Sequence, residues 1–205
     1  MATNVTEKQA ISKVINRLTN AERFFFLLLF APSDNNCPNP VKGSTWLQKE
    51  LFAISKNVPL VEEEADYNAY RYGSFSETIN EIFDQFEISK YVEKDSSGNI
   101  GLTPKGDKLS SALWESTDAK NKGLVCDIKR EFNDMSLNEL LLFMYVTYPE
   151  TAENSDVRDK ILHERCPIAL SLLRKGKVTL QKAAELAGIK LEDFIQLAKT
   201  SVKCT

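Results

Sequence analysis

The side chains best suited to catalysis or metal binding are few and far apart. The chain has one histidine, His163, and no CxxC pair among Cys37, Cys126, Cys166 and Cys204. A structural zinc site needs four ligands, and a Cys–His nucleophile pair needs an activated thiol beside its base. His163 and Cys166 fall close together on an expected helix, but two side chains do not make a zinc site. We expect free thiols in a reducing cytoplasm.

The other common catalytic signatures are missing from the sequence. It has no glycine-rich phosphate loop, nucleophile elbow or pair of metal-binding carboxylates. The acidic run from Glu62 to Asp66 is expected to be a solvated loop rather than a metal site. We therefore expect a non-catalytic binding or regulatory protein with no cofactor and no metal.

Charge is distributed unevenly along the chain. The 205 residues carry a formal charge of −3, but residues 1–60 carry +3, residues 61–160 carry −10 and residues 161–205 carry +4. A basic C-terminal end after an acidic middle predicts different partners for the two regions. Ordinary variation among helix surfaces is the alternative explanation.

Hydroxyl side chains mark four expected helix starts. In a capping box, the N-cap hydroxyl accepts a hydrogen bond from a free backbone N–H, and a glutamate three residues later bonds back. Three such boxes and one N-cap before proline occur, at Thr19/Glu22, Ser74/Glu77, Ser136/Glu139 and Thr103/Pro104. With the apolar periodicity, they predict helices at about 5–18, 20–31, 44–57, 75–89, 104–118, 122–133, 136–148, 154–163, 166–174, 179–187 and 191–202.

The most apolar stretch runs from Phe24 to Ala31 and is followed by a proline-containing loop expected at 32–42. A bilayer crossing needs about 20 apolar residues, so this stretch is too short to span a membrane. It predicts either a helix buried on all sides or one that leaves a face for a partner subunit. Leu137 to Val146 is also apolar enough to reach a partner.

Two short extended segments predict a β-hairpin. Tyr91–Lys94 and Asn99–Leu102 flank the turn residues Asp95–Gly98. The order helix, helix, hairpin, helix between 44 and 118 is that of a winged helix. The expected fold is mostly α, with a domain at 1–119 that contains the winged helix and its small β-hairpin wing. A helical domain at 120–205 follows.

Three motifs carry a family resemblance in the first domain. GSTWLQKELF at 43–52, YRYGSFSE at 70–77 and LTPKG at 102–106 resemble the YwgA-like and Panacea-type families. The resemblance implies a winged-helix fold, and some Panacea members act as antitoxins or proteolysis adaptors. Ser74 departs from the family pattern, which usually has proline at this position.

The helix expected at 75–89 is acidic, so we expect it to avoid DNA phosphates, which bind Lys and Arg. We interpret it as a surface for protein contact or dimerisation. The tyrosines before it are more simply a packed aromatic cluster, although stacking on bases is the alternative. The candidate partner-binding residues are Tyr70, Arg71, Tyr72, Glu77, Glu81 and Asp84.

Residues 178–197 resemble the bihelical helix-turn-helix pattern and the small predicted helix-turn-helix proteins of prokaryotic toxin–antitoxin loci. Ala184 falls where the pattern needs a small residue, and Gly188 fits a turn with positive φ. Ile189, Phe194 and Leu197 are expected to be buried. The pattern predicts a second helix-turn-helix in the C-terminal domain.

By this resemblance, the helix at 191–202 would enter the major groove of double-stranded DNA. Base contacts are then expected from Lys190, Glu192 and Gln196. Phosphate contacts are expected from Arg174, Lys175, Lys177, Lys182 and Lys199. The acidic pair that begins this helix opposes phosphate binding, so a structural helical cap and a protein-docking module are the alternatives.

Together these patterns favour a cytoplasmic, prokaryotic-type DNA-binding transcriptional regulator or antitoxin-like protein that acts as a homodimer. A protein-interaction adaptor that uses a winged-helix scaffold without contacting DNA is the alternative function.

Overall fold

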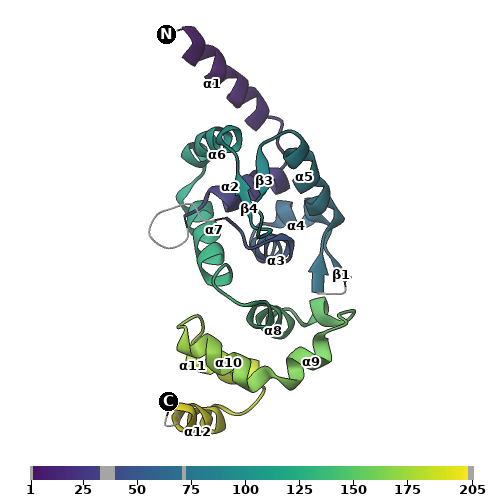
Figure 1. The fold of residues 1–205 in the computed structure, drawn as a ribbon, viewed down its shortest axis with the longest axis vertical. Coiled ribbons are helices and arrows are strands. Elements are labelled where there is room, and N and C mark those ends of the chain that lie inside the picture. The colour runs from purple at the N-terminus through teal and green to yellow at the C-terminus, as the bar shows by residue number, and fades with distance from the viewer. Residues whose placement is uncertain (1, 33–39, 71–72, 203–205) are drawn as a thin grey trace. The chain divides into compact units, whose positions relative to one another are not determined.

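The computed structural model in Figure 1 describes residues 2–32, 40–70 and 73–202. These residues form twelve α-helices, a short 3-10 helix and two small two-stranded sheets. The predicted mostly α fold is confirmed. Within the described residues, no helix combines the length and apolarity that a bilayer crossing requires.

The chain forms two compact units, and the first comprises Met1–Tyr67 and Phe75–Asn133. Its elements are α1 (Ala2–Ile15), α2 (Asn20–Phe30), α3 (Ser44–Ser55), α4 (Pro59–Ala65), α5 (Glu77–Ile88), β3 (Val92–Lys94), β4 (Ile100–Leu102), α6 (Pro104–Ser116) and α7 (Ala119–Phe132). The domain boundary predicted at 119/120 falls at the start of α7, and α7 belongs to this unit. Val125 and Phe132 of α7 are buried, and the helix packs against α2 and α3.

The second unit comprises Asn68–Ser74 and Asp134–Thr205. Its elements are β1 (Asn68–Tyr70), most of β2 (Gly73–Phe75), α8 (Leu137–Thr147), η2 (Pro149–Ala152), α9 (Arg158–His163), α10 (Arg165–Arg174), α11 (Leu180–Ala187) and α12 (Leu191–Val202). All the helices predicted beyond residue 133 are present. The largest difference is at 154–163, where α9 begins only at Arg158 because the chain first forms η2.

Helix α2 forms the centre of the first unit and packs against α3, α4, α6 and α7 (Figure 1). Every side chain from Phe24 to Leu29 is buried, and Phe26 packs edge-on against Phe86 of α5 at 4.6 Å between ring centroids. The apolar stretch is therefore buried within the unit instead of leaving a face for a partner subunit. The capping box of Thr19 at its start is confirmed.

The C-terminal end of α2 is held by a buried lysine. Lys129 of α7 has no exposed surface, and its Nζ donates to the carbonyl oxygens of Leu29 and Ala31 at 3.0 and 2.8 Å. An ammonium group is favourable at this end of a helix because the last carbonyls carry partial negative charge. Lys129 thus supplies partners for oxygens that a helix end leaves unpaired.

A buried carboxyl group lies in the electrostatic field of Lys129. Glu50 of α3 is fully buried, and neither of its carboxyl oxygens has a hydrogen-bond partner among the described residues. Burial raises the pKa of Glu50 to about 8, and the charges of Lys129 and Lys42 oppose the rise. Burial likewise lowers the pKa of Lys129, against the opposing effect of Glu50.

The β-hairpin predicted at 91–102 is confirmed. Strands β3 and β4 are antiparallel, with Val92 opposite Leu102 and Lys94 opposite Ile100. In the turn, the Asp95 carboxylate accepts hydrogen bonds from the backbone N–H groups of Ser97 and Asn99. The hairpin leads into α6, whose predicted N-cap at Thr103 is also confirmed.

Two local predictions are wrong. The acidic residues Glu62–Glu64 lie in α4 rather than in a loop, because Pro59 at the first helical position starts a helix there. Ser74 lies in β2 and does not cap a helix. The N-cap of α5 is Ser76, whose Oγ accepts from the N–H of Ile79 at 3.1 Å. Much of the loop expected at 32–42 lies outside the described residues.

Candidate functional site

Helices α11 and α12 are joined by the predicted turn at Gly188. Thr179 caps the start of α11, and Gly188 ends the helix with φ of +67°, in the left-handed region. Its N–H donates to the carbonyl of Glu185 at 3.0 Å, and the N–H of Ile189 donates to Ala184 at 3.3 Å. Helix α12 begins at Leu191, three residues after Gly188, so the turn between the two helices is short and hydrogen-bonded.

The small side chains of α11 pack closely against their neighbours. Ala183, Ala184 and Ala187 are buried, as is Phe194 of α12. The predicted burial of Phe194 is confirmed. The predicted burial of Ile189 is wrong. Because Ile189 lies in the turn rather than on the packed face of a helix, 36% of its surface remains exposed.

An arginine from α10 fixes the Gly188 turn. Arg165 donates from Nε to the carbonyl of Leu186 at 2.9 Å and from Nη2 to the carbonyl of Glu185 at 3.2 Å. Its guanidinium lies so close to Gly188 that a Cβ at that position would be 2.1 Å from the Arg165 Cζ. Arg165 could not be predicted from the sequence, because its partners lie about 20 positions away and no local pattern signals the contact.

The candidate base-contacting residues remain open to solvent. Lys190, Glu192 and Gln196 are exposed, as is Lys199. Residues 192, 196 and 199 share one face of α12, because residues three or four apart are neighbours on a helix surface. The structure thus brings these predicted residues together on the exposed side of the second helix.

Three of the lysines proposed to bind phosphate form ion pairs within the second unit. Lys182 pairs with Glu185 at 2.8 Å within α11. Lys177 pairs with Asp134 at 3.4 Å, and only 12% of its side chain is exposed. Lys175 pairs with the buried Glu139 of α8 at 2.8 Å. Arg174 is exposed at the end of α10. Lys175 and Lys177 therefore hold the unit together and contribute less to a surface for phosphate.

Glu139 links α8 to α10 through a dense set of hydrogen bonds. Its carboxylate accepts from Lys175 Nζ at 2.8 Å, from Ser171 Oγ at 2.7 Å and from the N–H of Ser136 at 2.7 Å, which confirms the capping box at 136–139. Burial alone would raise the pKa of Glu139. The hydrogen bonds from Lys175, Ser171 and Ser136 outweigh burial and lower the pKa to about 2.

This carboxylate makes the second unit sensitive to acid. The folded-state pKa of Glu139 lies below its ordinary value of 4.5. Its contribution is therefore present above pH 4.5 and is lost as the pH falls towards about 2. We expect Glu139→Gln to reduce the free energy of unfolding at pH 7 by about 2 kcal/mol. Urea unfolding of both proteins at several pH values, followed by circular dichroism, checks this expectation.

Glu150→Gln is the matched control, because Glu150 is exposed in the same unit. This variant should keep the wild-type stability at every pH. Equal acid sensitivity of wild type and Glu139→Gln between pH 4.5 and 2 would contradict the role assigned to Glu139.

The acidic face of α5 lies in the first unit. Glu77, Glu81 and Asp84 are exposed on one side of the helix, opposite the buried face that includes Phe83. Ile88 extends this side and is 79% exposed. Within the described residues, none of the three carboxylates takes part in an ion pair. Tyr70 ends β1, and Arg71 and Tyr72 lie outside the described residues, so the roles predicted for these three stay predictions.

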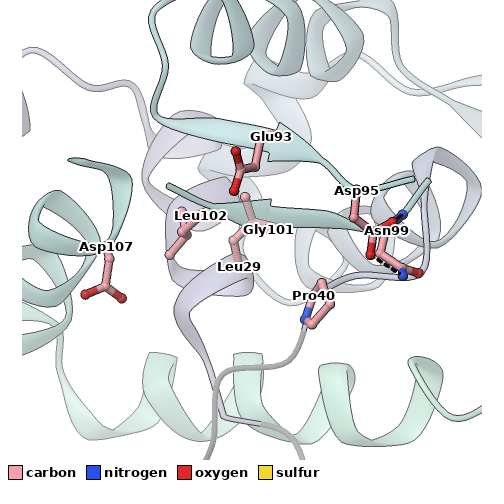
Figure 2. Close-up of a pocket in the computed structure, with 8 residues that line it drawn as sticks. All are labelled: Leu29, Pro40, Glu93, Asp95, Asn99, Gly101, Leu102 and Asp107. Carbon is pink, nitrogen blue, oxygen red and sulfur yellow. Dashed lines mark hydrogen bonds between the residues drawn. The ribbon is translucent and has the colours of Figure 1, made fainter. Parts of the chain in front are cut away.

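A pocket of about 300 Å³ lies beside the β3–β4 hairpin (Figure 2). Its lining residues are Leu29, Pro40, Glu93, Asp95, Asn99, Gly101, Leu102 and Asp107. Asp95 is already bonded to Asn99 in the hairpin turn, as Figure 2 shows. In the parts of the chain that the structure describes, no group of three histidine, cysteine or acidic side chains is placed to hold a metal ion.

Comparisons of the chain with models of protein families, with curated proteins and with solved structures found no match.

Proposed function

We propose that the protein is a non-catalytic, DNA-binding regulator that uses α11 and α12 as a helix-turn-helix. The observation that carries the proposal is the short Gly188 turn, fixed by Arg165. It supports α12 as a rigid second helix with Gln196 and Lys199 exposed on it and Lys190 exposed directly before it. A recognition helix needs this combination of a fixed orientation and exposed polar side chains.

The exposed side chains suit both kinds of DNA contact. Gln196 can form paired hydrogen bonds with adenine, and Glu192 can accept from the amino group of cytosine. Lys190 and Lys199 can pair with phosphates on either side. Because Lys175 and Lys177 are held in ion pairs, each protomer makes few phosphate contacts. A homodimer on two half-sites then supplies the affinity that one protomer lacks.

The first unit takes the protein-binding role in this proposal. Its order of α3, α5, the β3–β4 hairpin and α6 suits a winged helix. The exposed carboxylates of Glu77, Glu81 and Asp84 would repel DNA phosphates and attract a basic protein surface. An antitoxin-like division of labour follows, with a protein partner on α5 and DNA on α12.

Salt-dependent binding of the wild-type protein to duplex DNA tests the proposal. Each phosphate contact lowers the slope of log affinity against log salt by about 0.9, so two lysines per protomer predict a slope of roughly −2 per protomer. Fluorescence anisotropy measures this slope with a labelled random duplex, at salt concentrations from about 20 to about 200 mM. Failure to bind at the lowest salt would refute DNA binding.

A protein-interaction adaptor without DNA contact is the second candidate function. The ion pairs of Lys175, Lys177 and Lys182 and the exposed acids Glu192 and Asp193 favour it. The same titration separates the two candidates, because an adaptor should not bind duplex DNA at low salt.

A further inference from the structure

The chain of the first unit contributes a hairpin to the second. Between α4 and α5, the chain leaves the first unit after Tyr67 and returns at Phe75, and residues Asn68–Ser74 belong to the second unit. Within that unit, β1 packs against η2. The chain therefore passes between the units at three places, after residues 67, 74 and 133, instead of once through a linker.

A buried polar cluster in the first unit holds both ends of this hairpin. We call it the hairpin base, and it consists of Gln48, Ala65, Tyr67 and Ser76. The amide of Gln48 donates to the carbonyl of Ser76 at 2.9 Å and accepts from the N–H of Ser76 at 3.0 Å. The Tyr67 hydroxyl donates to the backbone carbonyl of Gln48 at 3.4 Å.

Ser76 connects the hairpin base to the acidic helix. Its Oγ donates to the carbonyl of Ala65, at the end of α4, and accepts from the N–H of Ile79 in the first turn of α5. Gln48 and Ser76 are both buried, so breaking these bonds leaves polar groups without water. The start of α5, the end of α4 and the two ends of the hairpin are therefore fixed by one set of bonds.

We propose that the inserted hairpin couples the two units thermodynamically, so that opening of the hairpin base loosens the second unit. The coupling depends on two observations. The bonds of the hairpin base lie in the first unit, and residues 68–74 belong to the second unit. The consequence for binding rests on the proposed function, in which a protein partner binds α5 and DNA binds α12. A protein that orders the start of α5 at Glu77 and Glu81 would stabilise the unit that contains α12. By linkage, DNA on α12 would favour that partner equally.

Hydrogen exchange on the full chain tests the coupling. Gln48→Met keeps the side-chain volume but removes both bonds to Ser76, so the variant should fold. We expect exchange about tenfold faster than wild type in η2 and α8, as well as at the start of α5. Tyr67→Phe removes a weaker bond and should change the same amides in the same direction, less strongly. Faster exchange confined to the first unit would overturn the inference.

Leu109→Ala is the matched control, because it destabilises the first unit by a cavity in α6 without touching the hairpin base. It should accelerate exchange in α6 far more than in η2. If Leu109→Ala and Gln48→Met accelerated η2 equally, the coupling would not pass through the hairpin base and the inference would fail. DNA titration of the wild type is independent of both outcomes, so failure of the coupling and failure of the proposed function are separable.

Discussion

Lys129→Met is expected to destabilise the first unit by about 3–5 kcal/mol. Lys129 is wholly buried and bonds to the carbonyls of Leu29 and Ala31. Its loss removes the ammonium donor shared by both oxygens and the main positive charge that acts on Glu50. Both tryptophans, Trp46 and Trp114, lie in the first unit. Urea unfolding followed by tryptophan fluorescence therefore reports this loss directly.

Two companion variants show whether the loss comes from the buried charge. Lys120→Met changes an exposed lysine of the same helix and should alter stability by less than about 0.5 kcal/mol. Adding Glu50→Leu to Lys129→Met should restore part of the lost stability, because it removes the second buried ionisable group. An unfolding midpoint of Lys129→Met equal to that of wild type would contradict the assigned role.

Gly188→Ala is expected to destabilise the α10–α12 region by roughly 3 kcal/mol. The new Cβ meets a left-handed backbone conformation, at a cost of about 1–2 kcal/mol. It also displaces the Arg165 guanidinium and breaks its bonds to Glu185 and Leu186. The half-buried thiol of Cys166, 3.8 Å from the carbonyl of Ala187, reports on this region. Its labelling should become faster, while Cys126 in the first unit should react as in wild type.

Gly176→Ala separates backbone strain from the collision with Arg165. Gly176 has nearly the same φ, +68°, but an added Cβ there meets no atom within 4 Å. This variant should lose only about 1 kcal/mol. Equal losses at Gly176 and Gly188 would show that Arg165 contributes nothing to the turn. In an Arg165→Ala background, the cost of Gly188→Ala should shrink, since the two residues share one interaction.

Elements defined by short-range patterns could be predicted from the sequence. The caps at Thr19, Thr103 and Ser136, the turn at Gly188 and the β3–β4 hairpin all depend on residues within a few positions of one another. Local hydrogen bonds and backbone preferences decide such features, and the residue types and spacings that produce them are visible in the sequence.

Features decided by distant residues could not be predicted in the same way. Ser74 and Ser76 are both plausible caps for α5, and Gln48, on another helix, bonds to Ser76. The net positive charge of residues 161–205 suggests more lysines free to contact DNA than the structure offers. Lys175, for example, pairs with Glu139, 36 positions away. Arg165, Lys129 and the insertion of the hairpin into the second unit likewise depend on tertiary contacts.

A comparison of salt slopes tests whether α12 and the turn before it contact DNA through Lys199 and Lys190. Lys190→Glu with Lys199→Glu should weaken duplex binding by at least about tenfold and reduce the magnitude of the salt slope by roughly 2 per protomer. Lys8→Glu with Lys120→Glu, two exposed lysines of the first unit, should leave affinity and slope near the wild-type values. If both double variants bound DNA with the wild-type affinity and slope, α12 would not be the DNA-contacting helix.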